Sequence, residues 1–241
     1  MKRISFLLAL CLPLIGFCQK QTIATDKATY DGSLWAKRLY YLQWVQGTDN
    51  YMYYKDNNLA IFDSKGTQVG GIDLQKLSQT YSLKGNPTIS YIDANQVVIE
   101  EGNKFHIYDY VIEKPLFTIT LPENAQNAEY NHTQRAVAYT LDNNLFLATA
   151  EEPRFPIAVF KDENIISGQF IHRNEFGIQK GIFWSPNGNY IAFYQKDVSQ
   201  VTDYPLVDIN TTPATVKSIK YPMAGGKNEI AKVGVFDVAK K

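Results

Sequence analysis

The sequence predicts an all-β fold, a partial β-propeller of about four blades. Three observations predict it: a short motif recurs every 40 to 50 residues, each repeat contains several short apolar runs, and no helical stretch is evident. The 16 tyrosines and 13 phenylalanines favour strands. Of the 241 residues, 45% are hydrophobic and 20% are charged, so the chain has enough apolar material to fold around a core.

The segment 1–18 is predicted to be a signal peptide. A basic pair precedes an apolar run over 4–17, which is shorter than the roughly 20 residues of a membrane-spanning helix. Gly16 and Cys18 are small residues at the third and the last position before a cleavage site. The protein is therefore expected to be exported, to the periplasm or the extracellular space. A lipid anchor at Cys18 is the alternative, which the bulky residue before it disfavours.

Residues 19–46 are interpreted as a segment leading into the propeller, and the propeller is predicted to span 47–241. Its recurrent motif begins with asparagine and continues with apolar residues, in three copies at 57–63, 103–109 and 143–147. A further apolar run precedes each copy, and the Asn, Asp and Gly residues between the two runs tolerate the positive φ of a tight turn. Each unit is therefore expected to contain a β-hairpin.

A fourth unit begins at Trp184, where the turn sequence Ser-Pro-Asn-Gly is followed by a strand over 190–194. Its partner strand is expected only at 235–237, which matches 107–109 about three periods later, so an excursion between Asp197 and about Lys227 is inserted. The strands are apolar on consecutive residues, as expected for blades covered on both faces. A β-sandwich, the alternative fold, would alternate more regularly.

The composition excludes several classes of function. With 24 basic and 24 acidic residues, the chain offers no electrostatic reason to bind nucleic acid or anionic lipid. It contains no Gly-x-Ser-x-Gly elbow, phosphate-binding glycine loop or metal-ligand cluster, so no cofactor or metal is expected. Among the histidines, His106 occupies a repeated strand position and is interpreted as a packing residue. His172 and Glu175 could share a metal on one helical turn, but no third ligand is evident.

A polar segment over 171–181 interrupts the repeat immediately before the first strand of the fourth blade. Loops on rigid scaffolds often carry binding sites. From composition alone, however, its single carboxylate, Glu175, is a solvated surface residue.

Three segments carry a resemblance to a known family, and they lie at 171–194, 201–207 and 220–225. The turn sequence Trp-Ser-Pro-Asn-Gly, with an acidic segment before it and Tyr-Pro-x-Ala-Gly after it, resembles the propeller of the dipeptidyl peptidase IV branch of the prolyl oligopeptidase family of serine peptidases. The resemblance implies an eight-bladed propeller that caps an α/β-hydrolase domain with a Ser-Asp-His triad. The chain would then be a fragment without the hydrolase domain and without a catalytic residue of its own.

The resemblance assigns Glu175 to the recognition of the substrate's N-terminal amine. A peptide α-amino group has a pKa near 8 and is cationic at neutral pH, so a carboxylate binds it by a charge-assisted hydrogen bond. Dipeptidyl members present two adjacent glutamates, whereas Asn174 precedes Glu175 here. A single glutamate followed by Phe-Gly-Ile resembles bacterial prolyl tripeptidyl peptidases at least as closely. The released product is therefore expected to be an Xaa-Pro dipeptide or an Xaa-Xaa-Pro tripeptide.

Two classes of function stay open. The first is the substrate-gating and amine-anchoring propeller of a serine exopeptidase, with proline-containing peptides as substrates and with the homodimer common in the family. The second is a secreted, non-enzymatic propeller that only binds a partner. A Gly-x-Ser-x-Gly elbow further along the reading frame would favour the first class, and a stop codon near Lys241 would favour the second.

Overall fold

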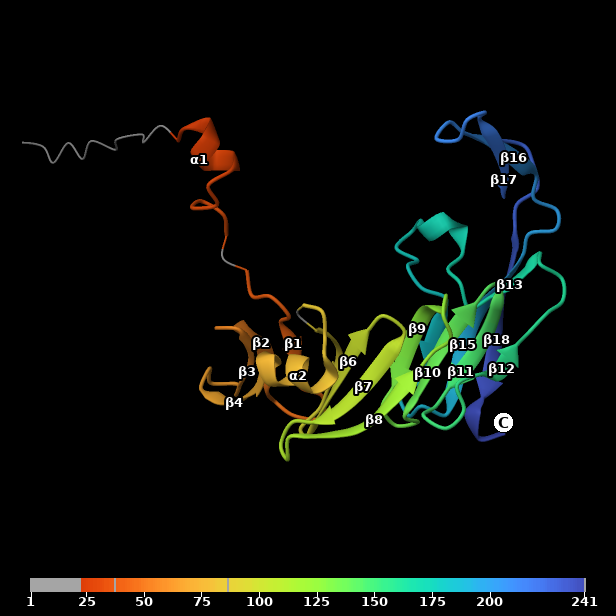
Figure 1. Ribbon diagram of the computed structural model, residues 1–241. Helices are drawn as coiled ribbons and strands as arrows, with labels where there is room; N and C mark the ends of the chain where they lie inside the picture. The colour runs from red at the N-terminus through yellow and green to blue at the C-terminus, as the bar shows by residue number, and fades with distance from the viewer. Residues whose placement is uncertain (1–22, 37, 86, 241) are drawn as a thin grey trace, which may run out of the picture. The chain divides into compact units, whose positions relative to one another are not determined.

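The computed structural model describes residues 23–36, 38–85 and 87–240. The predicted signal peptide lies outside these residues. The chain divides into two compact units, Met1–Leu39 and Tyr40–Lys241. The described part of the first unit contains one short helix, α1 (Thr25–Thr29), which buries no residue (Figure 1). No helix among the described residues is long and apolar enough to cross a membrane.

In the described part of the second unit, the strands form four four-stranded sheets and one two-stranded hairpin (Figure 1). In the first three sheets, consecutive antiparallel strands lie side by side, which is the arrangement of a propeller blade. The first blade contains β1 (Gln43–Trp44), β2 (Tyr51–Lys55), β3 (Asn58–Phe62) and β4 (Gln68–Asp73). The second contains β5 (Thr88–Ile92), β6 (Gln96–Glu101), β7 (Lys104–Asp109) and β8 (Lys114–Thr120). The third contains β9 (Gln126–Asn131), β10 (Ala136–Leu141), β11 (Asn144–Ala148) and β12 (Phe155–Ala158).

The fourth blade is built around one long strand, β15. Its elements are β13 (Ile165–Ser167), η1 (His172–Asn174), β14 (Ile182–Trp184), β15 (Tyr190–Asp197), β18 (Ile230–Asp237) and η2 (Val238–Lys240). Strand β18 pairs with β15 along its whole length. Between these two strands the chain makes the hairpin of β16 (Asp203–Asp208) and β17 (Thr215–Lys220). The predicted late partner strand and the excursion that precedes it are therefore confirmed.

The recurrent motif is confirmed as one strand position repeated in successive blades. Its copies form β3, β7 and β11, each paired with the preceding apolar run as a hairpin. In the first of these hairpins Asp56 and Asn57 have φ of 49° and 63°, as a tight turn that matches the strand twist requires. The first blade also includes β1 at 43–44, ahead of residue 47, where the sequence predicts the propeller to begin.

Helix α2 (Leu74–Tyr81), which follows β4, was not predicted. Asp73 caps it, because its Oδ1 accepts hydrogen bonds from the N–H groups of Gln75 at 2.8 Å and Lys76 at 3.0 Å. Leu74 and Leu77 are buried against the first two blades. The expectation that the chain has no helical stretch is therefore wrong at this connection.

Apolar residues gather in three clusters, one at each contact between successive blades. Neighbouring residues of one strand enter different clusters: Val97 and Ile99 face the first blade, whereas Val98 faces the third. Likewise, Ala138 packs toward the fourth blade and Val137 toward the second. The second and third blades therefore bury both faces, which explains why their strands are apolar on consecutive residues. This arrangement confirms the predicted propeller and not the alternative β-sandwich.

Candidate functional site

The polar segment of the fourth blade lies inside a strand and not before it. Strands β13 and β14 pair with the same edge of β15, Ser167 opposite Gln195 and Ile182 opposite Phe193. They are two halves of one interrupted strand. Between these halves, residues 168–181, here called the insert, leave the sheet. The sequence predicts that the polar segment starts at residue 171 and precedes the first strand of the blade. This pairing corrects the prediction, because β13 already forms part of that strand ahead of the segment.

Two glycines close the base of the insert. The Gly168 N–H donates to the Tyr194 carbonyl at 2.8 Å, and the Tyr194 N–H donates to the Gly181 carbonyl at 2.9 Å. A Cβ on Gly181 would lie 2.2 Å from the carbonyl oxygen of Gln169, so only glycine fits where the two stems pass each other. Gly168 has a φ of 78°, and a Cβ there would lie 2.8 Å from Cγ2 of Thr140. These glycines let the insert leave and re-enter the strand at one point.

The insert holds Glu175 through a strained one-turn helix, η1. His172, Asn174 and Phe176 all have left-handed backbones, with φ of 51°, 68° and 56°. Such conformations cost non-glycine residues free energy and are often found at functional sites. The Glu175 N–H donates to the His172 carbonyl at 3.0 Å, and its own carbonyl accepts from Ile178 at 3.0 Å. The backbone of Glu175 is therefore fixed on both sides, while the residue itself is exposed.

Asn174 stands where the resemblance leads one to expect a second glutamate. Its φ of 68° lies in the left-handed region, which asparagine tolerates better than most residues. The local backbone therefore suits asparagine at this position.

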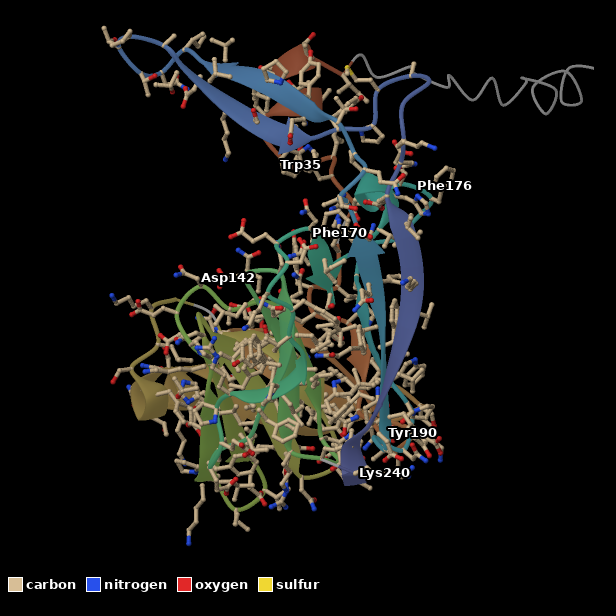
Figure 2. The ribbon with its side chains drawn as sticks, turned by 90° about the vertical axis from the view of Figure 1, so that its right-hand side faces the viewer. Trp35, Asp142, Phe170, Phe176, Tyr190 and Lys240 are labelled. Atoms are coloured by element: carbon tan, nitrogen blue, oxygen red, sulfur yellow. The ribbon has the colours of Figure 1, made fainter. Side chains whose placement is uncertain are left out.

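Glu175 lines a cavity of about 760 Å³, here called the insert cavity. The insert contributes Phe170, His172, Glu175 and Phe176 to it, β15 contributes Lys196, and the chain between β15 and β18 contributes Tyr221 and Glu229. Figure 2 shows Phe170 and Phe176 at the opposite end of the fourth blade from Tyr190 and Lys240. The Phe176 side chain is 86% exposed. The cavity thus combines charged groups with an exposed aromatic ring, as small-molecule and peptide sites do.

The second carboxylate of this cavity, Glu229, is committed to partners within the chain. Its Oε1 accepts the His172 N–H at 2.9 Å, and its Oε2 lies 3.9 Å from Nζ of Lys196. Both side chains of this ion pair are mostly buried, 12% exposed for Glu229 and 14% for Lys196. Among the side chains that the structure describes, none donates a hydrogen bond to the Glu175 carboxylate. Glu175 is therefore the carboxylate available to a cation that enters the cavity.

The sequence predicts Glu175 as a site residue but gives no indication of Glu229 or of the role of the two closing glycines. Glu229 lies 57 residues from its partner His172 and carries no local motif. The glycines had a signal, since they bracket the polar segment, but only the paired strands show that the insert leaves and returns at one point.

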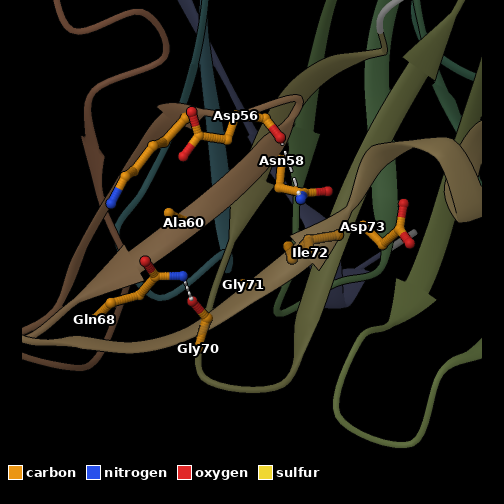
Figure 3. A pocket seen from close by; sticks show the side chains of 9 residues that line it. Asp56, Asn58, Ala60, Gln68, Gly70, Gly71, Ile72 and Asp73 are labelled. Atoms are coloured by element: carbon orange, nitrogen blue, oxygen red, sulfur yellow. Dashed lines mark hydrogen bonds between the residues drawn. The ribbon is translucent and has the colours of Figure 1, made fainter.

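A second hollow, of about 340 Å³, lies on the first blade (Figure 3). Gly70 and Gly71 of β4 line it, and the absence of their side chains contributes to the space. The amide of Gln68 donates to the Gly70 carbonyl at 3.4 Å. One of the two carboxylates that line the hollow, Asp73, already caps α2. The other, Asp56, is exposed in the tight turn between β2 and β3.

His106 is confirmed as a packing residue. It is 6% exposed, its ring stacks on Tyr81 with the ring centres 4.3 Å apart, and its Nδ1 lies 2.9 Å from Oγ1 of Thr118. Burial lowers the pKa of His106, and Lys104 acts in the same direction. Glu101, whose carboxylate lies 3.7 Å from Nε2, acts in the opposite direction without reversing the shift.

The lowered pKa of His106 predicts a loss of stability in acid. An unfolded histidine, with a pKa of about 6.5, binds a proton more readily than the folded one, so the contribution of His106 is present above that pH and is lost below it. His106→Phe, which introduces the residue found at the matching position 146, removes this dependence. The unfolding free energy of the wild type minus that of the variant should decrease from about pH 8 to about pH 5, as measured by urea denaturation. A constant difference would contradict this account.

Comparisons with known proteins agree with this architecture. The family model of the dipeptidyl peptidase IV N-terminal region matches residues 96–241. Dipeptidyl peptidase 4 of Sus scrofa is 25% identical in an alignment of 235 residues that covers 86% of this chain and 29% of that protein. A crystal structure assigned as a dipeptidyl aminopeptidase IV from Bacteroides ovatus is 34% identical, with a TM-score of 0.71, over 87% of this chain and 30% of that one.

The dipeptidyl peptidase 4 of Porphyromonas gingivalis shares the fold, with a TM-score of 0.58 at 17% identity over 91% of this chain and 34% of that one. The chain spans about a sixth of the length of the first curated relatives and about a third of the solved structures. The matched region 96–241 contains the second blade from β6 onward, the third and fourth blades, and the whole insert. With more than half of its residues matched, the chain belongs to the family of the dipeptidyl peptidase IV N-terminal region.

Proposed function

We propose that this chain is the substrate-gating and amine-anchoring propeller of an exported serine exopeptidase that releases Xaa-Pro dipeptides or Xaa-Xaa-Pro tripeptides. The observation that carries the proposal is Glu175: an exposed carboxylate whose backbone is bonded on both sides, on an insert that lines a cavity of about 760 Å³. The family membership supports peptides as the class of substrate. The nucleophile and its triad would be supplied by a hydrolase domain of the full-length protein, and that protein would be a homodimer.

In this proposal the Glu175 carboxylate receives the ammonium group of the peptide. A charge-assisted hydrogen bond of this kind is about twice as strong as one between neutral groups. Because Lys196 already compensates Glu229, the carboxylate of Glu175 supplies the negative charge for the substrate. A fixed ammonium also fixes how many residues reach the nucleophile, so the released length is set by the distance between the two.

The choice between dipeptide and tripeptide depends on this distance. The single glutamate after the left-handed Asn174 supports the tripeptide as much as the dipeptide. The test is kcat/KM of the full-length protein on Xaa-Pro and Xaa-Xaa-Pro reporter peptides, each with a free and with an acetylated N-terminus. We expect one length with a free amine to be preferred by at least about tenfold. Equal rates on free and acetylated peptides would refute amine anchoring, and no turnover of any of them would favour the binding propeller.

A further inference from the structure

The insert is tied to the rest of the fourth blade at a point far from its stems. The Oε1 atom of Glu229, in the segment just before β18, accepts the His172 N–H at 2.9 Å. His172 begins η1, and its carbonyl accepts the Glu175 N–H at 3.0 Å. Two successive hydrogen bonds therefore connect Glu229 to the backbone of Glu175.

We propose that Glu229 is a positioning residue that holds η1 in place and thereby sets where Glu175 meets the substrate amine. This inference rests on the proposed function of Glu175, but its structural part can be measured without substrate.

The burial and the charge of Glu229 suit this role. The side chain is 12% exposed, and Lys196, whose Nζ lies 3.9 Å away, compensates its charge. Lys196 is itself fixed to the base of the insert, since it donates to the Phe170 carbonyl at 3.2 Å. A hydrogen bond to a charged acceptor that is shielded from water is stronger than an exposed neutral one. Glu229 and Lys196 thus hold the insert at His172 and at Phe170.

The backbone of the insert needs such a restraint. His172 itself has a φ of 51°, which a non-glycine residue adopts only at a cost in free energy. Without the acceptor on its N–H, the turn can relax toward a right-handed conformation, and Glu175 would move with it. Glu229 therefore favours the one conformation in which Glu175 lines the insert cavity.

Two conservative variants separate the effect of the length of the Glu229 side chain from the effect of its charge. Glu229→Asp keeps the charge beside Lys196 but shortens the side chain by one methylene, so that it no longer reaches the His172 N–H. Glu229→Gln keeps the reach and an acceptor oxygen but loses the charge. Asp203→Ala is the matched control, because it removes an acidic partner, 3.2 Å from Lys220, beside the same cavity without touching the insert.

The first readout is amide hydrogen exchange of residues 171–178 in the full-length protein without substrate. We expect Glu229→Asp to raise the exchange rate of the His172 amide by about ten- to hundredfold, while Glu229→Gln keeps most of the protection and the control changes nothing. If the ion pair with Lys196 alone protected the His172 amide, Glu229→Gln would raise its exchange rate more than Glu229→Asp. That reversed order, or unchanged exchange in Glu229→Asp, would overturn the inference.

The second readout is kinetic and separates this inference from the proposed function. Glu229→Asp should raise KM about tenfold for a free-amine peptide and leave the acetylated peptide unaffected. If Glu175→Gln is amine-selective but Glu229→Asp leaves exchange and KM unchanged, the positioning role is refuted alone. If neither variant is amine-selective while exchange still rises in Glu229→Asp, the proposed function is refuted and the restraint of η1 by Glu229 stands.

Discussion

Glu175→Gln in the full-length protein is expected to lower kcat/KM for a free-amine peptide by roughly ten- to hundredfold. The change removes the charge and keeps the shape, so what is lost is the charge-assisted part of the hydrogen bond to the ammonium. KM should carry most of the loss if the amine is bound equally in the ground state and in the transition state. The measurement is steady-state kinetics on one reporter peptide of the preferred length.

The stability of the same variant should be unchanged, because Glu175 is exposed and no described side chain hydrogen-bonds to its carboxylate. Glu123→Gln, at an exposed carboxylate between the second and third blades, is the matched control and should leave kinetics and stability unaltered. A melting temperature that falls together with the activity would assign Glu175 a structural role.

Gly181→Ala is expected to destabilise the propeller by about 3 kcal/mol, at the upper end of what overpacking costs. The new Cβ would lie 2.2 Å from the Gln169 carbonyl oxygen and 2.7 Å from the carbonyl carbon of Gly168. Since these are backbone atoms, the stems must separate, and the hydrogen bonds of both stems to Tyr194 would be strained or lost. Urea denaturation and the exchange rates of the Gly168 and Tyr194 amides measure this effect.

Gly70→Ala is the control for this substitution. Gly70 also lies in a strand, its φ is not in the left-handed region, and the nearest atom to an added Cβ is Cβ of Ile61 at 4.0 Å. The expected change in unfolding free energy is less than about 1 kcal/mol in either direction. Similar effects of the two substitutions would show that the stems of the insert do not require glycine at 181.

The blades could be predicted because their signals are local and repeated. Each copy of the motif, such as 57–63, combines a turn that tolerates positive φ with a run of apolar residues on both sides. The late strand at Val235 was predicted by its match to Ile107, since the same position in each blade meets the same neighbours. Helix α2 was missed because its eight residues form a short connection whose cap, Asp73, is also the last residue of a strand.

The candidate site could be predicted only in part. The resemblance pointed to Glu175, but the geometry that fixes it depends on contacts between distant residues. The His172 N–H is a backbone donor, which has no signature in the sequence, and its acceptor Glu229 reads as an ordinary surface carboxylate. The crossing of the stems at Gly181 depends equally on the pairing of both halves of the interrupted strand with β15.

A double-mutant cycle shows whether the Glu175 carboxylate binds the substrate ammonium. The cycle measures kcat/KM for wild type and Glu175→Gln on a free-amine peptide and on its desamino analogue, in which hydrogen replaces the amino group. We predict that Glu175→Gln lowers kcat/KM by roughly ten- to hundredfold on the free-amine peptide and leaves it unchanged on the desamino analogue. An equal loss on both peptides, or no loss on either, would show that the Glu175 carboxylate does not bind the ammonium group.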